Sequence, residues 1–163
     1  LHTRLRSFIP PHVLNPRARR REKSPLEDYN HIKVAEIAKQ VVEQGGMVQA
    51  GGHGQLPGLC THWEMWSFAR GGFSPMEALS TATINPARYL KMDADIGSIE
   101  KRKLADLVIM DANPLEDIRN TDKISHVMIN GRLYEAGSLK EVHSGDQELK
   151  PFYWQGKPES EIF

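Results

Sequence analysis

His53 is the residue whose type and position are most suggestive of chemistry. It follows a short, largely apolar run at residues 47–50 and has glycines at positions 51, 52 and 54, which let the backbone bend sharply. In parallel α/β folds, ligands and catalytic groups gather beyond the carboxyl end of a strand. A neutral imidazole placed there could bind a transition metal or take up a proton. The alternative is a histidine that only hydrogen-bonds within a loop, and the residues themselves leave both interpretations open.

Three other reactive side chains cluster at residues 60–64. His62 and Glu64 are two positions apart, so on a helix they point in different directions and do not form the His-Glu-x-x-His zinc pattern. A Thr-x-x-Glu capping box, from Thr61 to Glu64, explains Glu64 as a helix cap. We expect His62 to be structural and Cys60 to be a buried or incidental thiol, because spacing identifies no histidine–acid partner for it.

Helices and one strand must position His53. Residues 29–44 carry apolar side chains at spacings of three and four, a stripe widened by Ile37 and Val41, which predicts an amphipathic helix. Two glycines then end the helix, and residues 47–50 are long enough for a short buried strand. A helix that turns on glycine into a buried strand is the repeating unit of α/β folds.

Residues 61–92 are predicted to hold further helices. The first would run from about residue 62 to residue 70. Residues 74–77 read Ser-Pro-Met-Glu, a capping box with proline at the first helical position, and an Asn-Pro pair at residues 85–86 starts a third short helix.

Strands replace helices in the second half of the chain. Residues 104–110 and 125–129 predict two strands, and the Asn-Gly pair at 130–131 predicts a tight hairpin turn into residues 132–134. Residues 1–27, with four prolines, are expected to be mostly loop with one short helix. The tail carries three consecutive aromatic residues at 152–154, which we expect to dock on a surface because an exposed aromatic patch is costly.

Composition excludes several classes of protein. The 163 residues have no net charge, because 21 basic residues cancel 21 acidic ones, which argues against a nucleic-acid partner bound by a global basic field. No apolar run is long enough for a membrane span. The single cysteine, Cys60, excludes an internal disulfide framework. A soluble chain of this kind could be cytoplasmic or periplasmic, and the sequence leaves the compartment unknown.

Several segments, in the right order, resemble the metal-dependent amidohydrolases. Residues 74–79 (SPMEAL) and 82–90 (ATINPARYL) are similar to the last helices of that family. Residues 96–100 (IGSIE) and 103–109 (KLADLVI) resemble the segment that leaves its barrel, and residues 127–132 (VMINGR) resemble its closing hairpin.

The finer resemblance is to the imidazolonepropionase-related branch of the urease- and dihydroorotase-like superfamily. The Gly-x-His-Gly-Gln segment around His53 and the His-Trp-Glu segment at residues 62–64 carry it. One departure is Arg102, which stands where the family usually has glycine in a surface turn.

The resemblance implies an α/β fold that is incomplete. Residues 1–95 would be the C-terminal segment of a (β/α)8 TIM-type barrel, with residues 47–50 as its last strand. Residues 96–137 would be part of a composite β-sandwich, and residues 138–163 a C-terminal tail.

The resemblance also implies a divalent metal, with zinc expected, in the complete parent. Such enzymes use one or two metals to activate water for attack on an amide or cyclic amide carbon–nitrogen bond. The family's other metal ligands lie on earlier strands, and none occurs here in a matching context. His53 stands where the family usually has a metal-binding aspartate that accepts a proton, which makes it the candidate catalytic residue and metal ligand. We therefore expect the fragment by itself to be inactive, and it need not hold a metal.

Two other classes stay open. Because position 53 holds a histidine in place of an aspartate, a non-catalytic amidohydrolase-like scaffold or binding subunit is an alternative hypothesis. An independent α+β binding domain would need a self-contained core. For the enzyme, a small molecule or a peptide is expected as substrate. Because a barrel closes only when all of its strands pair, we expect a homo-oligomer or association with the missing part of the fold.

Overall fold

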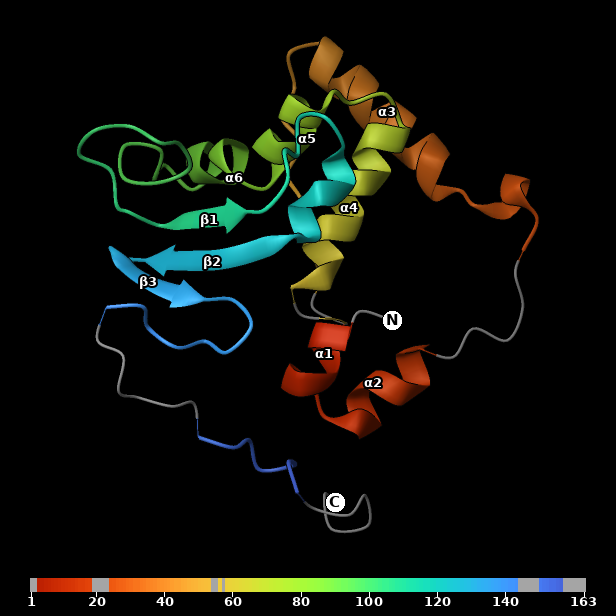
Figure 1. Cartoon of the computed structure of the whole chain (residues 1–163). Coiled ribbons are helices and arrows are strands. Elements are labelled where there is room, and N and C mark those ends of the chain that lie inside the picture. The colour runs from red at the N-terminus through yellow and green to blue at the C-terminus, as the bar shows by residue number, and fades with distance from the viewer. Residues whose placement is uncertain (1–2, 19–23, 54–55, 57, 144–149, 157–163) are drawn as a thin grey trace.

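The computed structural model describes residues 3–18, 24–53, 56, 58–143 and 150–156 (Figure 1). Within these residues a group of helices lies beside one small β-sheet. No helix in the described part of the chain is both long and apolar enough to cross a membrane. Gly54, the last glycine of the predicted bend, lies outside the described residues.

The first 27 residues contain more helix than predicted. Helix α1 spans Thr3–Phe8 and helix α2 spans Pro11–Ala18, followed by a short 3-10 helix, η1, at Leu26–Asp28. Pro11 occupies the first position of α2, where its missing N–H costs nothing. A small core stabilises the two helices by joining them to residues more than forty positions away, and its buried members are Ile9, Leu14, Leu56 and Leu59. The expectation of mostly loop was wrong because that partner segment is distant in sequence.

The predicted helix at residues 29–44 is confirmed as α3, which spans His31–Glu43. Helix α4 spans Leu59–Arg70 and begins about three residues before its predicted start. Helices α3 and α4 pack on each other and, with α5 (Pro75–Thr81), surround a second core of Met65, Phe73, Ala78 and Ile118. Helix α6 follows at Ile84–Tyr89.

The capping box at the start of α5 is confirmed. The Ser74 hydroxyl accepts a hydrogen bond from the Glu77 backbone N–H at 3.3 Å, and the Ser74 N–H donates to the Glu77 carboxylate at 2.7 Å. This local signal is satisfied by residues three positions apart, so it needs no distant partner.

Residues 47–50 are not a β-strand within the described chain, which corrects the prediction. They run extended, and helices rather than strands hold them. The Ala50 N–H donates to the Thr81 carbonyl at 2.9 Å, and the Asn85 side-chain amide donates to the Val48 carbonyl at 3.0 Å. A barrel strand acquires its ladder from neighbouring strands, and the described residues supply none beside this segment.

The second half of the chain forms a three-stranded antiparallel sheet in the order β1-β2-β3. The strands are β1 (Leu107–Met110), β2 (Ile124–Ile129) and β3 (Arg132–Glu135), with a 3-10 helix, η2 (Ile118–Asp122), before β2. The predicted hairpin turn is confirmed, since Asn130 and Gly131 have φ values of 50° and 80°. The second layer that a β-sandwich needs is not seen in the described residues.

The aromatic tail docks on α1. The Phe152 and Phe8 rings meet edge to face with centroids 6.1 Å apart, and the Gln155 side-chain amide donates to the Ser7 carbonyl at 3.2 Å. Residues 150–156 are the part of the tail that the structure describes beyond residue 143.

Trp66 joins the helices to the sheet segment. Its indole N–H lies 3.0 Å from both the Ile118 carbonyl and the hydroxyl of Thr121, a fully buried residue in η2.

We predict that Trp66→Phe, which keeps the aromatic body but removes this donor, lowers the free energy of unfolding by about 1 kcal/mol. Urea denaturation would measure the loss. Trp63→Phe is the matched control on the same helix, where the side chain is 41% exposed, and an equal loss in both variants would contradict the prediction.

An apolar stripe on α3 faces solvent. Val34, Ile37 and Val41 are 63%, 60% and 44% exposed, although they repeat at helical spacing. The predicted widening of the apolar face is therefore present in sequence but is not covered by the described residues. Contiguous exposed apolar patches are uncommon on monomeric soluble proteins.

Candidate functional site

His53 lies at the end of the extended segment, on an exposed turn that packs against α4. The turn is shaped by Gly52, whose φ of 57° is a left-handed conformation that favours glycine. A β-carbon at this position would lie 2.7 Å from the Thr61 hydroxyl oxygen, so the turn backbone approaches α4 closely. His53 is the residue that directly follows this turn, and its side chain belongs to an exposed residue.

Glu64 holds this turn from the middle of α4. One of its carboxylate oxygens, Oε2, accepts hydrogen bonds from the backbone N–H groups of Gly51 at 2.6 Å and Gly52 at 2.9 Å. The interpretation of Glu64 as a capping residue was wrong. Helix α4 has Gly58 as its N-cap, with no side-chain hydrogen bond to that cap, so position 64 lies well inside the helix.

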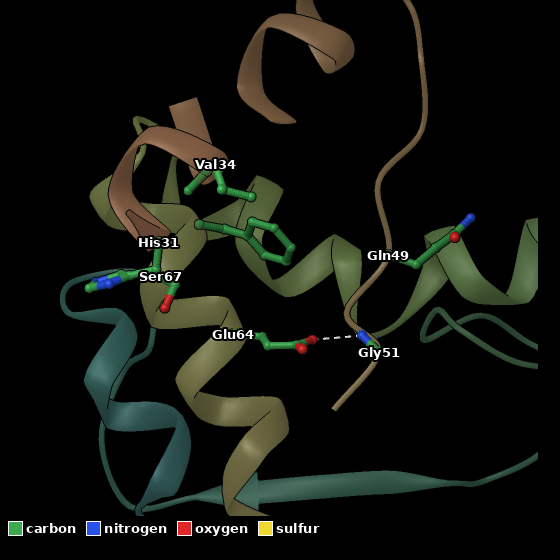
Figure 2. Close-up of a pocket in the computed structure, with 8 residues that line it drawn as sticks. His31, Val34, Gln49, Gly51, Glu64 and Ser67 are labelled. Carbon is green, nitrogen blue, oxygen red and sulfur yellow. Dashed lines mark hydrogen bonds between the residues drawn. The ribbon is translucent and has the colours of Figure 1, made fainter. Parts of the chain in front are cut away.

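A cavity of about 440 Å³ lies between α3, α4 and the extended segment (Figure 2). Its wall combines apolar side chains with a few polar ones, and it is formed by His31, Val34, Ala35, Gln49, Gly51, Glu64, Ser67 and Phe68. Figure 2 shows the Glu64 side chain reaching from α4 to Gly51. The Ser67 hydroxyl instead bonds within its own helix, to the Trp63 carbonyl at 2.8 Å.

His31 is in contact with Arg70, near the same cavity. The Arg70 guanidinium lies 3.0 Å from His31 Nε2. A guanidinium can only donate, so Arg70 is the donor in this contact. The pair joins the first turn of α3 to the last turn of α4.

The other candidates from the sequence do not join His53. Cys60 is half-buried and packs against the core formed by α1 and α2, in keeping with a structural thiol. His62 packs at a tilt beside Trp66, with ring centroids 6.4 Å apart.

The described residues do not fit a complete metal site. No group of three or more His, Cys, Asp or Glu side chains in the described part of the chain is placed to hold a metal ion. Catalytic zinc takes three protein ligands, so His53 could be one member of such a set and no more. Among the described residues, His53 therefore lacks the further ligands that a metal site needs.

The Glu64 contact is the feature that sequence reasoning missed. It joins residues 12 and 13 positions apart, across a turn whose course no local motif specifies. One signal was available in the sequence. Glu64 is the lone acidic residue in the stretch of helix from Leu59 to Ala69, where a carboxylate that is even partly buried needs a hydrogen-bond donor.

Comparisons with known proteins point to one family. Residues 57–134 match the amidohydrolase family. The chain is 38% identical over 78 residues to an imidazolonepropionase from Symbiobacterium thermophilum, covering 45% of this chain and 18% of that protein. It is 31% identical over 115 residues to an ochratoxinase from Aspergillus niger, covering 68% of this chain and 23% of that protein.

A solved structure shows the same likeness. The structure of a Xaa-Pro dipeptidase with methionine bound in its active site matches with a TM-score of 0.57 and 30% sequence identity. That match covers 63% of this chain and 25% of the dipeptidase. The chain thus spans a quarter or less of the length of these three proteins, and the likeness implies that its helices are a fragment of a TIM barrel. The family likeness of this chain is to the amidohydrolases, and it is carried by residues 57–134.

Proposed function

We propose that this chain is the C-terminal part of an amidohydrolase-family hydrolase that cleaves a carbon–nitrogen bond. The single observation that carries the proposal is the position of His53, on a fixed turn beyond the carboxyl end of residues 47–50, within a chain whose adjoining residues match the family. Active sites of barrel enzymes lie at that end of the strands. The relatives include an imidazolonepropionase and a Xaa-Pro dipeptidase, so a cyclic amide or a peptide is the substrate class we propose.

Metal dependence belongs to the same proposal. His53 would be the one ligand that this chain contributes, and the other ligands would come from parts of the barrel outside these 163 residues. Zinc is the metal we propose, because a neutral imidazole suits it and it leaves a position open in catalytic sites. With only one ligand of its own, the chain by itself is expected to have no hydrolase activity.

A non-catalytic scaffold is the second candidate, and one observation favours it. A histidine at position 53 cannot supply the negative charge of an aspartate, and the described residues contain no further metal-binding cluster. A protein that had lost its metal ligands could keep the barrel as a binding surface.

The uncovered α3 stripe supports a partner for this chain. We propose that Val34, Ile37 and Val41 pack against the rest of the barrel, or against a second copy of the chain when that part is absent. Sedimentation of the 163-residue chain would test this. Self-association that is weakened by Ile37→Lys supports it, and a compact monomer of the unmodified chain contradicts it.

The test of function compares the longer protein that contains this chain with its His53→Ala variant. We expect the unmodified protein to carry one or two zinc ions by metal analysis and to hydrolyse a panel of dipeptides and cyclic amides. The variant is expected to lose at least one metal equivalent and most of its activity, because a catalytic zinc that loses one of its protein ligands is held too weakly.

A histidine elsewhere in the fold provides the control for this test. His126→Ala, in β2, should leave both metal content and activity unchanged. Absence of metal and of hydrolysis in the unmodified protein would support the scaffold instead. Bound metal with full activity in His53→Ala would remove His53 from the site.

A further inference from the structure

We propose that Glu64 is a positioning residue, which holds the turn at Gly51 and Gly52 against α4 and thereby fixes the backbone that carries His53. This inference rests on the proposed function for the importance of His53, but the contact itself is independent of it. The sequence gives Glu64 the role of a helix cap, and the structure assigns it a different one.

The first support is the geometry of the contact. Two consecutive backbone N–H groups converge on one carboxylate oxygen, at 2.6 and 2.9 Å. Hydrogen bonds to an ionised acceptor are about twice as strong as those between neutral groups. A side chain in the interior of α4 has little rotational freedom left once both bonds form, so the turn is tied to a rigid element.

The second support is that the preceding residue is held as well. The Ala50 N–H donates to the Thr81 carbonyl at the end of α5. The N–H groups of residues 50, 51 and 52 are therefore all bound by the helical layer, in an unbroken series that ends immediately before His53.

The third support is steric. Gly52 adopts a left-handed conformation, and Thr61 leaves no room for a β-carbon on it. Thr61 and Glu64 lie three positions apart on α4, one turn of helix, so they present their side chains on the same face. One turn of α4 thus shapes the backbone before His53 in two ways, by hydrogen bonds and by close contact.

The chemistry of the contact specifies a glutamate. An aspartate is one methylene shorter and would not reach both N–H groups from the same position on α4. A glutamine keeps the length and one accepting oxygen but loses the charge. We therefore expect the order Glu, then Gln, then Asp and Ala in the strength with which the turn is held.

Amide hydrogen exchange in the 163-residue chain tests the inference. Glu64→Ala is expected to raise the exchange rates of the Gly51 and Gly52 amides by about ten-fold or more, because a charge-assisted hydrogen bond is lost. Glu64→Gln is expected to raise them by less. The NMR order parameter of the His53 amide should fall in the same variants. Ser67→Ala is the matched control, because Ser67 lines the same cavity from the same helix but bonds only its own helix.

The outcomes separate this inference from the proposed function. Unchanged exchange at Gly51 and Gly52 in Glu64→Ala would overturn it, as would a uniform rise throughout the chain with no excess at those two residues. If Glu64→Ala does not fold, Glu64→Gln decides by the same two readings. In the longer protein, loosening of the turn accompanied by weaker Zn²⁺ binding supports both proposals. Loosening in a protein that binds no Zn²⁺ supports the positioning role and contradicts the metal-dependent function.

Discussion

Replacing Gly71 with alanine is expected to destabilise the fold by about 3 kcal/mol, near the upper end of the usual cost of overpacking. Gly71 ends α4 where that helix meets α3. A β-carbon there would lie 2.4 Å from the backbone carbonyl carbon of Ala35 and 2.7 Å from the backbone nitrogen of Glu36. Backbone atoms cannot rotate away as a flexible side chain can, so α3 and α4 would have to separate.

The sign of this effect is set by sterics and not by backbone preference. Gly71 has φ of −88° and ψ of 10°, a conformation that alanine adopts without strain. At such a position glycine to alanine ordinarily stabilises a protein by about 0.4–1 kcal/mol, because it restricts the unfolded chain. The contact with α3 must overcome that gain before any net loss is seen.

Urea denaturation followed by far-ultraviolet circular dichroism would measure the change. Gly137→Ala is the control, since nothing lies within 4 Å of the position where its β-carbon would be. It should leave stability unchanged or slightly raised. Equal stability of Gly71→Ala and the unmodified chain would mean that α3 and α4 do not pack as closely as described.

Features set by neighbouring residues were predictable from the sequence. The capping box from Ser74 to Glu77 and the turn at Asn130 and Gly131 each bring together residues within three positions of one another, so the motif contains its own partners. Helix α3 was predictable for a related reason. Its apolar residues repeat at helical spacing within the segment itself, so the pattern does not depend on the identity of the packing partner.

Features set by distant residues were not predictable. Helices α1 and α2 depend on Leu56 and Leu59, and Glu64 depends on a turn twelve residues earlier. The prediction of a strand at residues 47–50 was wrong because a strand also needs partners. The sequence suits a strand, but the hydrogen bonds must come from neighbouring strands, which the described residues do not supply beside it. The candidate site divides in the same way. The bend before His53 could be expected from its glycines, and the hydrogen bonds from Glu64 that hold it could not.

The second large effect on stability is expected from breaking the ion pair between Glu77 and Lys39. Lys39 Nζ donates to Glu77 Oε1 at 2.6 Å and also lies 5.7 Å from the centre of the buried Phe73 ring. We expect Glu77→Gln to lower the free energy of unfolding at neutral pH by about 2 kcal/mol, the loss of a charge-assisted hydrogen bond discounted for water, since the Glu77 side chain is 36% exposed. Glutamine keeps the length needed for the capping box, so the change isolates the charge.

The matched control uses the same lysine. Glu43 lies 4.0 Å from Lys39 Nζ, one turn along α3, with its side chain 61% exposed. Glu43→Gln removes the same charge from the same partner, but in a solvated setting where such pairs contribute only a few tenths of a kcal/mol. Similar losses in the two variants would show that net charge, and not the contact between α3 and α5, is responsible.

The pH dependence of the Glu77 effect has a definite sign. The hydrogen bond from Lys39, assisted by those from Ser74, lowers the pKa of Glu77 from 4.5 to about 2. A carboxyl group with a lowered pKa in the folded state stabilises the fold above its unfolded pKa, and that contribution falls as the pH drops from about 4.5 toward 2. The difference between the unmodified chain and Glu77→Gln should therefore be full at neutral pH and small near pH 2. Urea denaturation across that window would measure it, and a difference that stays constant with pH would show that the ionised carboxylate of Glu77 is not what joins α5 to α3.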